Sequence, residues 1–307
     1  MRNLIYLFIS LLIIATSCNS NPFNEYDENL IYINNLKGKV KSVKSETYRA
    51  TDIFGEIVKE GLVSPFFDLS NTLTTIFSPN STFEFAENGL TTSSTISKYN
   101  FTYSLKQIYD KKWNIIEEHF IIDDNEIIGK YNTVDGKIVS ATSYDIEGRV
   151  ESSNEFLYEN NLIKEVIKKN NDEKIVSKIL YNYEDKNQIE SIYGESGKLQ
   201  QKNKKDIYGR YLEVGIPGDI KIINYEGKNP IPFELFRYED NQIVGKFEIT
   251  LDDHKNISEI KDIDINDEFE TLYKYTYKYD KRGNWIERIK YENNNLKYIT
   301  ERTIEYY

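Results

Sequence analysis

The chain has 307 residues, and 39 Lys and Arg against 50 Asp and Glu give it a formal net charge of −11. An acidic protein of this kind repels nucleic acid and anionic headgroups, so the composition argues against a polyanionic partner. A single cysteine, Cys18, excludes a disulfide framework, a thiolate zinc site and a cysteine nucleophile from the rest of the chain.

The first residues have the pattern of a secretory signal. A basic start at Arg2 is followed by 12 almost wholly apolar residues, Leu4 to Ala15, and by small residues before Cys18. As a helix this run reaches about 18 Å, well short of the roughly 30 Å of hydrocarbon in a bilayer. The segment is therefore expected to be a signal peptide and not a membrane-spanning helix.

The segment Ala15-Thr16-Ser17-Cys18 resembles the lipobox of bacterial lipoproteins, with Ala15 where that family usually has Leu. The resemblance implies cleavage before Cys18, lipidation of its thiol, and anchoring in the bacterial cell envelope on the periplasmic or the outer face. We therefore expect a signal peptide at 1–17 and a polar tether at 18–34. An ordinary secretory signal with an incidental cysteine is the alternative. Removing 1–17 leaves 38 basic and 50 acidic residues, so the net charge becomes 38 − 50 = −12.

Short turn clusters, most of them led by an aromatic residue, recur through the rest of the chain. Gly and Asn accept the positive φ of tight hairpin turns, and Asp or Asn side chains bond back to the backbone of the turn. The 25 Tyr and 15 Phe against one Met are also typical of strands. We expect a single all-β domain over 35–307, an antiparallel meander of about 16–20 strands that forms an open, curved sheet or half-barrel. The clusters lie at 109–115, 131–138, 144–150, 158–162, 183–189, 193–199, 238–243, 279–285 and 291–296.

Two of these clusters, Tyr144-Asp145-x-x-Gly148-Arg149-Val150 and Tyr279-Asp280-x-x-Gly283-Asn284-Trp285, resemble the YD repeats of the RHS and wall-associated repeat families. The end of the chain, 283–307, is also similar to the close of many uncharacterised lipoproteins of Bacteroidetes-type bacteria. The resemblance implies an array of β-hairpins and says almost nothing about activity. RHS proteins build large shells around a toxin, and this chain is far too short for that role.

Residues 61–97 break the pattern, because they contain no Lys or Arg and only three acidic residues. Phe66 and Phe67 lie there among Ser, Thr and Asn. One interpretation is a flap or short helix that covers an open face or edge of the sheet. The other is a contact surface for a partner.

Residues that could carry chemistry are few. His119 and His254 are the only histidines, no Gly-x-Ser-x-Gly is present, and both are expected at the surface. Asp262, Asp264 and Asn266 share one strand face but lack the Gly and Glu of an EF-hand loop, which favours a solvated face over a weak calcium site. We expect no metal and no cofactor.

The leading hypothesis is a non-catalytic lipoprotein of the cell envelope that contacts the membrane through Cys18 and binds a protein or glycan through a sheet face. The expected binding residues are Phe66, Phe67, Trp113 and Trp285. Both tryptophans follow equivalent turn positions, so packing within the repeats is the alternative for them. The alternative functions are an envelope glycan hydrolase that uses a pair of carboxylates, and a purely structural spacer.

Overall fold

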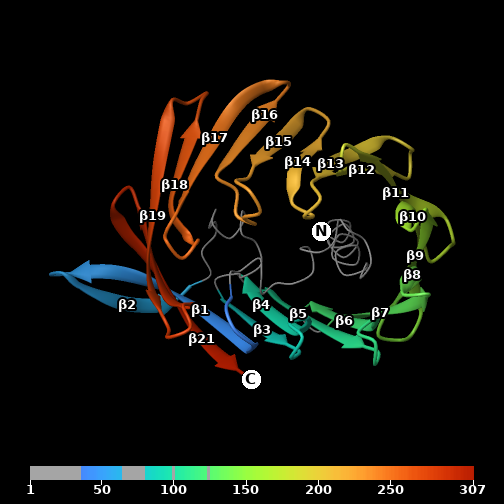
Figure 1. The fold of residues 1–307 in the computed structure, drawn as a ribbon, viewed down its shortest axis with the longest axis horizontal. Coiled ribbons are helices and arrows are strands. Elements are labelled where there is room, and N and C mark those ends of the chain that lie inside the picture. The colour runs from blue at the N-terminus through green and yellow to red at the C-terminus, as the bar shows by residue number, and fades with distance from the viewer. Residues whose placement is uncertain (1–35, 64–79, 99–100, 123–124) are drawn as a thin grey trace. The chain divides into compact units, whose positions relative to one another are not determined.

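The structure, a computed structural model, describes residues 36–63, 80–98, 101–122 and 125–307 (Figure 1). The predicted signal peptide, the tether and Cys18 lie outside the described residues. Contacts divide the chain into two compact units. One contains Leu105–Pro217, and the other contains the described residues up to Ser104 together with Gly218–Tyr307. In the described ranges, no helix has the length and apolar character needed to cross a membrane.

The described residues form 21 strands, slightly more than the expected 16–20, and antiparallel ladders join them. The prediction of an all-β fold built from successive hairpins is confirmed. In chain order the strands are β1 (Val40–Ile53), β2 (Glu56–Leu62), β3 (Asn80–Phe85), β4 (Thr91–Lys98), β5 (Phe101–Tyr109), β6 (Ile115–Ile122), β7 (Asn125–Val134), β8 (Lys137–Tyr144), β9 (Val150–Glu159), β10 (Leu162–Asn170), β11 (Ile175–Glu184), β12 (Asn187–Gly194), β13 (Leu199–Lys205), β14 (Tyr211–Ile216), β15 (Asp219–Asn224), β16 (Glu234–Glu239), β17 (Gln242–Leu251), β18 (Ile257–Asp264), β19 (Phe269–Tyr279), β20 (Trp285–Glu292) and β21 (Asn295–Tyr306).

Two kinds of turn recur between the described strands, and local chemistry specifies both. In the two-residue turns, such as Asn160-Asn161, both residues have positive φ, 51° and 67°, as a type I′ turn requires. In the longer turns an Asp bonds back to the backbone. Asp145 Oδ1 accepts from the N–H of Glu147 at 3.0 Å and of Arg149 at 2.8 Å, while Gly148 takes a φ of 77°. The same bonds recur in the turns that begin at Asp110, Asn170, Asp206, Asp252 and Asp280.

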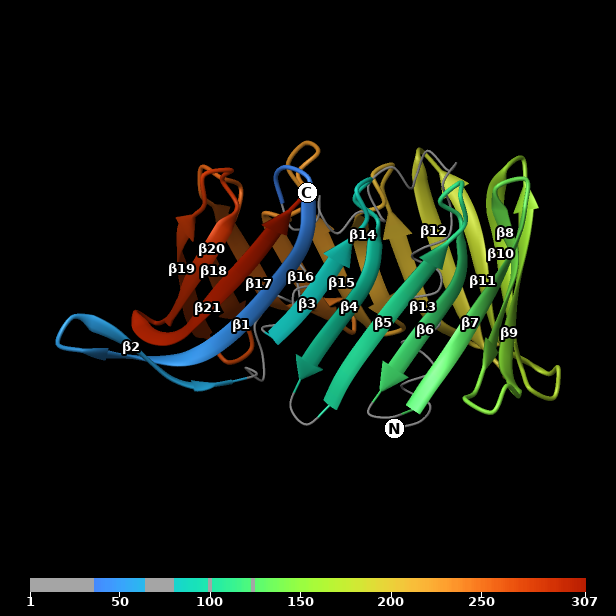
Figure 2. The ribbon, with the colours of Figure 1, turned by 90° about the horizontal axis from the view of Figure 1, so that it is seen from below.

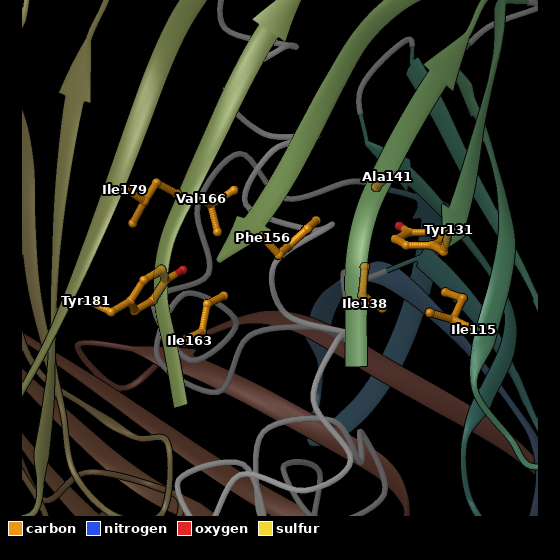
Figure 3. Close-up of a cluster of buried hydrophobic side chains, with 9 residues drawn as sticks. All are labelled: Ile115, Tyr131, Ile138, Ala141, Phe156, Ile163, Val166, Ile179 and Tyr181. Carbon is orange, nitrogen blue, oxygen red and sulfur yellow. The ribbon is translucent and has the colours of Figure 1, made fainter. Parts of the chain in front are cut away.

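One face of many of these strands supplies the apolar core. In the unit formed by Leu105–Pro217, nine buried side chains from β6 to β11 pack into one cluster (Figure 3). In the other unit one cluster includes Tyr275, against which Tyr273 and Tyr277 pack, so these tyrosines at alternate positions of β19 belong to the core face. A further cluster surrounds Val40, Val43 and Phe83. The nine residues of Figure 3 are Ile115, Tyr131, Ile138, Ala141, Phe156, Ile163, Val166, Ile179 and Tyr181.

The prediction of an open, curved sheet or half-barrel is wrong. An open meander leaves its first and last strands as edges, but β1 has ladders on both of its sides. It pairs with β21 from Val40↔Tyr306 to Arg49↔Tyr298, and on the other side with β3 from Ser42↔Glu84 to Ser45↔Ser81. The first and last strands are therefore joined, and the antiparallel sheet closes through β1. Closure satisfies the backbone groups that an open sheet would leave unpaired.

The low-charge segment 61–97 contributes strands to the sheet. Its part before β3 lies largely outside the described residues, as do Phe66 and Phe67. The described part forms β3 and most of β4, which pair with each other, and β3 also pairs with β1. Phe83 and Phe85 are 1% and 2% exposed in the core. The described residues of β3 and β4 are thus part of the sheet, and the flap and contact-surface interpretations of the rest of the segment stay predictions.

A buried asparagine joins the start of β1 to the turn between β19 and β20. Asn284, 2% exposed, accepts from the backbone N–H of Lys37 at 2.6 Å and donates to the carbonyl of Lys37 at 2.8 Å. Its amide also lies 2.7 Å from the hydroxyl of Tyr306, which in turn bonds to Asp280. This network lies next to the β1–β21 ladder and supports closure.

Replacing Asn284 with Ala should lower the free energy of unfolding by about 2–3 kcal/mol, because three hydrogen bonds are lost and the backbone groups of Lys37 lose their side-chain partner. Arg149→Ala is the matched control, since Arg149 holds the same position in the Asp145 turn. Its side chain is 70% exposed and, among the described residues, forms ion pairs within that turn, so its loss should cost under about 1 kcal/mol. Urea unfolding followed by circular dichroism measures both. Equal losses would contradict a role for Asn284 in closure.

Candidate functional site

The β1–β2 hairpin extends beyond the rest of the closed sheet (Figure 1, Figure 2). The ladder between β1 and β21 ends at Arg49, whereas β1 continues to Ile53. Among the described residues, β2 pairs only with this last part of β1, from Tyr48↔Leu62 to Ile53↔Glu56. The hairpin thus has a base within the sheet and an outer part held by a single ladder.

A tight turn sets the register of the hairpin. Phe54 and Gly55 form a two-residue turn with φ of 54° and 86°, as in a type I′ turn. The carboxylate of Asp52 accepts from the N–H of Gly55 at 2.7 Å, which stabilises the turn. A phenylalanine in the left-handed region is unfavourable, so a local cost is accepted to place this side chain at the tip.

Apolar side chains of the hairpin face solvent. All seven residues of β2 are exposed, and Phe54 at the tip is fully exposed. Soluble proteins rarely gather exposed apolar side chains on an outlying strand, and such strands attract other strands. The exposed apolar residues of the hairpin are Ile53, Phe54, Ile57, Val58 and Leu62.

The base of the hairpin is firmly held. The N–H of Val63 donates to the carbonyl of Thr47 at 2.8 Å. The side chain of Asn80, at the start of β3, bonds to the backbone of both residues, accepting from Thr47 at 2.8 Å and donating to Val63 at 2.9 Å. Lys59 bonds to Glu301 on β21 and lies 5.1 Å from the ring centroid of Tyr48. The outer strand therefore leaves the sheet in a defined direction.

Charge is distributed unevenly over the two faces of β2. Cross-strand pairing puts Val58 on the same face as Thr51, and the Thr51 hydroxyl donates to Glu60. Glu56 shares that face by alternation. One face of β2 therefore carries, in chain order, the acidic Glu56, the apolar Val58 and the acidic Glu60. The other face carries Ile57 and Lys59.

The two predicted tryptophans lie in different environments. Trp113 occupies the positive-φ position of its turn, with a φ of 64°, and is 44% exposed. Its ring centroid lies 6.1 Å from that of Tyr109. Trp285 is 8% exposed, and the guanidinium carbon of Arg302 lies 3.3 Å from its ring centroid. Trp113 belongs to the unit formed by Leu105–Pro217 and Trp285 to the other unit, and ligand binding by either stays a prediction.

The surroundings of Trp285 are cationic and buried. Arg288 also lies over the Trp285 ring, at 5.4 Å, and Lys290 lies 4.6 Å from the centroid of Tyr273. Burial lowers the pKa of Arg302 well below its usual value, and the nearby Arg288 charge lowers it further. Guanidinium groups stacked on rings stabilise the buried face of these strands. An open aromatic surface for sugar stacking is not what this arrangement offers.

The remaining candidates have structural partners. His254 stacks on Tyr279 with ring centroids 3.9 Å apart. Arg237 Nη2 lies 3.9 Å from Asp262 and 3.6 Å from Asp264, so a protein cation occupies the position considered for calcium. In the described ranges, no three His, Cys, Asp or Glu side chains form a group that could hold a metal ion.

His119 lies between two carboxylates on neighbouring strands. Its Nδ1 is 2.7 Å from Glu126 on β7, and its Nε2 is 2.7 Å from Glu117 on β6. The hydrogen bond to Glu126 is the main cause of a raised pKa of His119, and the bond to Glu117 contributes in the same direction. The imidazolium therefore links β6 to β7.

Sequence reasoning missed the hairpin as a site. The Gly after Phe54 was a usable turn signal, because it stands between two short runs that contain β-branched residues. Nothing in the sequence showed that β2 would lack a second partner among the described strands. That property depends on which strands pair with β1.

No protein-family model matches the sequence, and no curated protein matches it. Among solved structures, a porin-like protein from Bacteroides uniformis ATCC 8492 is 12% identical, with a TM-score of 0.33 over 88% of this chain and 98% of that chain. A porin-like protein from Bacteroides vulgatus ATCC 8482 is 10% identical, with a TM-score of 0.27 over 70% and 97% of the two chains. TcdB2-TccC3 without its hypervariable C-terminal region is 10% identical, with a TM-score of 0.23, over 84% of this chain and 19% of that one. At these TM-scores the similarities carry no argument about function.

The His119 link should make stability depend on pH. Because its pKa is raised in the folded state, the contribution is fully present below the ordinary His value of about 6.5 and is lost as the pH rises through the raised value. Loss of this contribution lowers the unfolding temperature of the wild type as the pH rises from about 6 to about 8. In His119→Gln this pH-dependent decrease should be smaller by on the order of 1–3 °C. Glu126→Gln removes the main cause of the raised pKa of His119, so it should also make the pH-dependent decrease smaller. Thermal unfolding with the same pH dependence in wild type and His119→Gln would contradict the link.

Proposed function

We propose that this protein is a non-catalytic, lipid-anchored protein of the bacterial cell envelope that binds a protein partner through the β1–β2 hairpin. The observation that carries the proposal is the outer strand β2, which has one ladder among the described residues and exposes apolar side chains. The resemblance of residues 15–18 to a lipobox supports the envelope location and the anchor at Cys18.

A protein ligand fits the hairpin better than a glycan does. An outer strand offers backbone donors and acceptors to an extended segment, which adds to the sheet as a further strand. Exposed side chains on alternate positions then give specificity. Glycan sites typically present open aromatic rings, but β2 itself carries no aromatic residue, and at Trp285 the Arg302 guanidinium lies 3.3 Å from the ring centroid.

The firm base of the hairpin favours binding. A strand held in one direction loses little conformational freedom when a partner adds to it, so more of the interaction energy appears as affinity. The bonds of Asn80 and Lys59 provide that base. The exposed side chain of Phe54 then supplies apolar area at the tip.

Site-specific photo-crosslinking in the producing bacterium tests the proposal. A photo-reactive phenylalanine analogue replaces Val58 in the full chain, and the control carries it at Thr303, an exposed position of β21. Irradiation should give a discrete protein adduct from position 58 and none from position 303, because only the former lies at the outer strand. An absence of adducts at position 58, or the same adducts at both positions, would overturn the proposal.

A further inference from the structure

The backbone of β2 presents alternate residues to a partner. In the two-residue hairpin, Ile53 and Glu56 flank the turn and form a hydrogen-bonded pair, and such pairs alternate with non-bonded pairs along the ladder. Thr51 and Val58 are then the next bonded pair. The N–H and C=O groups of Ile57 and Lys59 consequently point away from β1, toward any added strand.

The charges on β2 restrict what that strand can be. Glu56 and Glu60 flank Val58 on one face, and all three are exposed. In a strand added beside β2, the residues directly opposite come within about 5 Å at Cβ, where opposite charges attract and like charges repel. A matching segment has an apolar residue opposite Val58 and a basic residue on each side of it.

A second copy of the chain does not meet this requirement. Two copies of β2 could pair through the outward-pointing backbone groups of Ile57 and Lys59. Two antiparallel registers of this kind overlap over most of β2. In the first register, Ile57 bonds to Lys59 of the second copy, and Glu56 of each copy lies opposite Glu60 of its partner. In the second register, Lys59 lies opposite Lys59 of the second copy. Like charges in both registers disfavour self-association, which is how exposed edge strands avoid pairing with themselves.

We infer that β2 binds an extended protein segment of the pattern basic-x-apolar-x-basic, which adds to the sheet beside Ile57 and Lys59. This inference rests on the proposed function and names the partner chemistry. The pattern reads the same in both directions, so it fits a parallel or an antiparallel strand. An acidic chain of net charge −11 also attracts a basic partner over distance.

Fluorescence anisotropy with two labelled peptides, acetylated and amidated, tests the inference on the full chain in detergent. Thr-Lys-Thr-Val-Thr-Lys-Thr should bind, and Thr-Glu-Thr-Val-Thr-Glu-Thr should bind at least about fivefold more weakly, because two attractive pairs become repulsive. The double variant E56K/E60K should reverse the preference. A preference that is unchanged in this variant would overturn the inference, because the charges would then act elsewhere.

A second pair of variants separates strand addition from general attraction. Ile57→Pro removes an N–H that points outward, a position where an outer strand tolerates proline, and should abolish peptide binding. Ile57→Ala keeps this N–H and should retain most of the binding. Equal binding by the two variants would show that no strand is added and would overturn the inference.

The remaining outcomes distinguish this inference from the proposed function. Adducts at position 58 without binding of the basic peptide would overturn the partner pattern and leave the hairpin as a protein-binding site. Absence of both would overturn both. Binding of the full chain to phosphatidylcholine vesicles that is lost in Phe54→Ser, with no peptide binding, would assign the tip to a lipid surface and likewise overturn the inference.

Discussion

The ladder between β1 and β21 is the interaction on which the rest of the structure depends. It joins nine residue pairs from the two ends of the described chain. Without it, two strands of a single-layer sheet would each expose a row of unpaired backbone groups. The buried hydroxyls of Thr47 and Thr300, 2.9 Å apart, lie within this ladder, and Asn284 secures the residues just before it. The β1–β3 ladder on the other side of β1 then completes closure.

The same strand also creates the candidate binding site. β1 is 14 residues long, and its ladder with β21 ends at Arg49. Its last residues therefore leave the closed sheet and carry β2 with them. Strand length thus positions an outer strand that is firmly held at its base, while Glu56 and Glu60 give that strand a preference for basic segments. Sheet closure and the proposed partner recognition both depend on one long strand.

Sequence reasoning identified Trp285 and Trp113 by their equivalent positions after tyrosine-led turns, and the structure shows why equivalence in sequence was a weak guide. Trp113 takes the positive-φ place that Gly283 takes in the other turn, so the two side chains leave their turns differently. Trp285 enters the core face, where Arg302 packs on it. Arg302 lies 17 positions further along the chain, and no motif links it to Trp285.

Turn positions and the all-β class followed from the sequence alone, because a positive φ and an Asp that bonds to its own turn involve residues within five positions of one another. Closure did not follow from it. The Thr47–Thr300 contact spans 253 positions, and many strands show a similar alternation, so no local pattern selects β21 as the partner of β1. Only the tertiary structure decides which edges are paired and which strand is left outside. Hydrogen bonding between strands is a property of two distant segments, whereas a turn is a property of one.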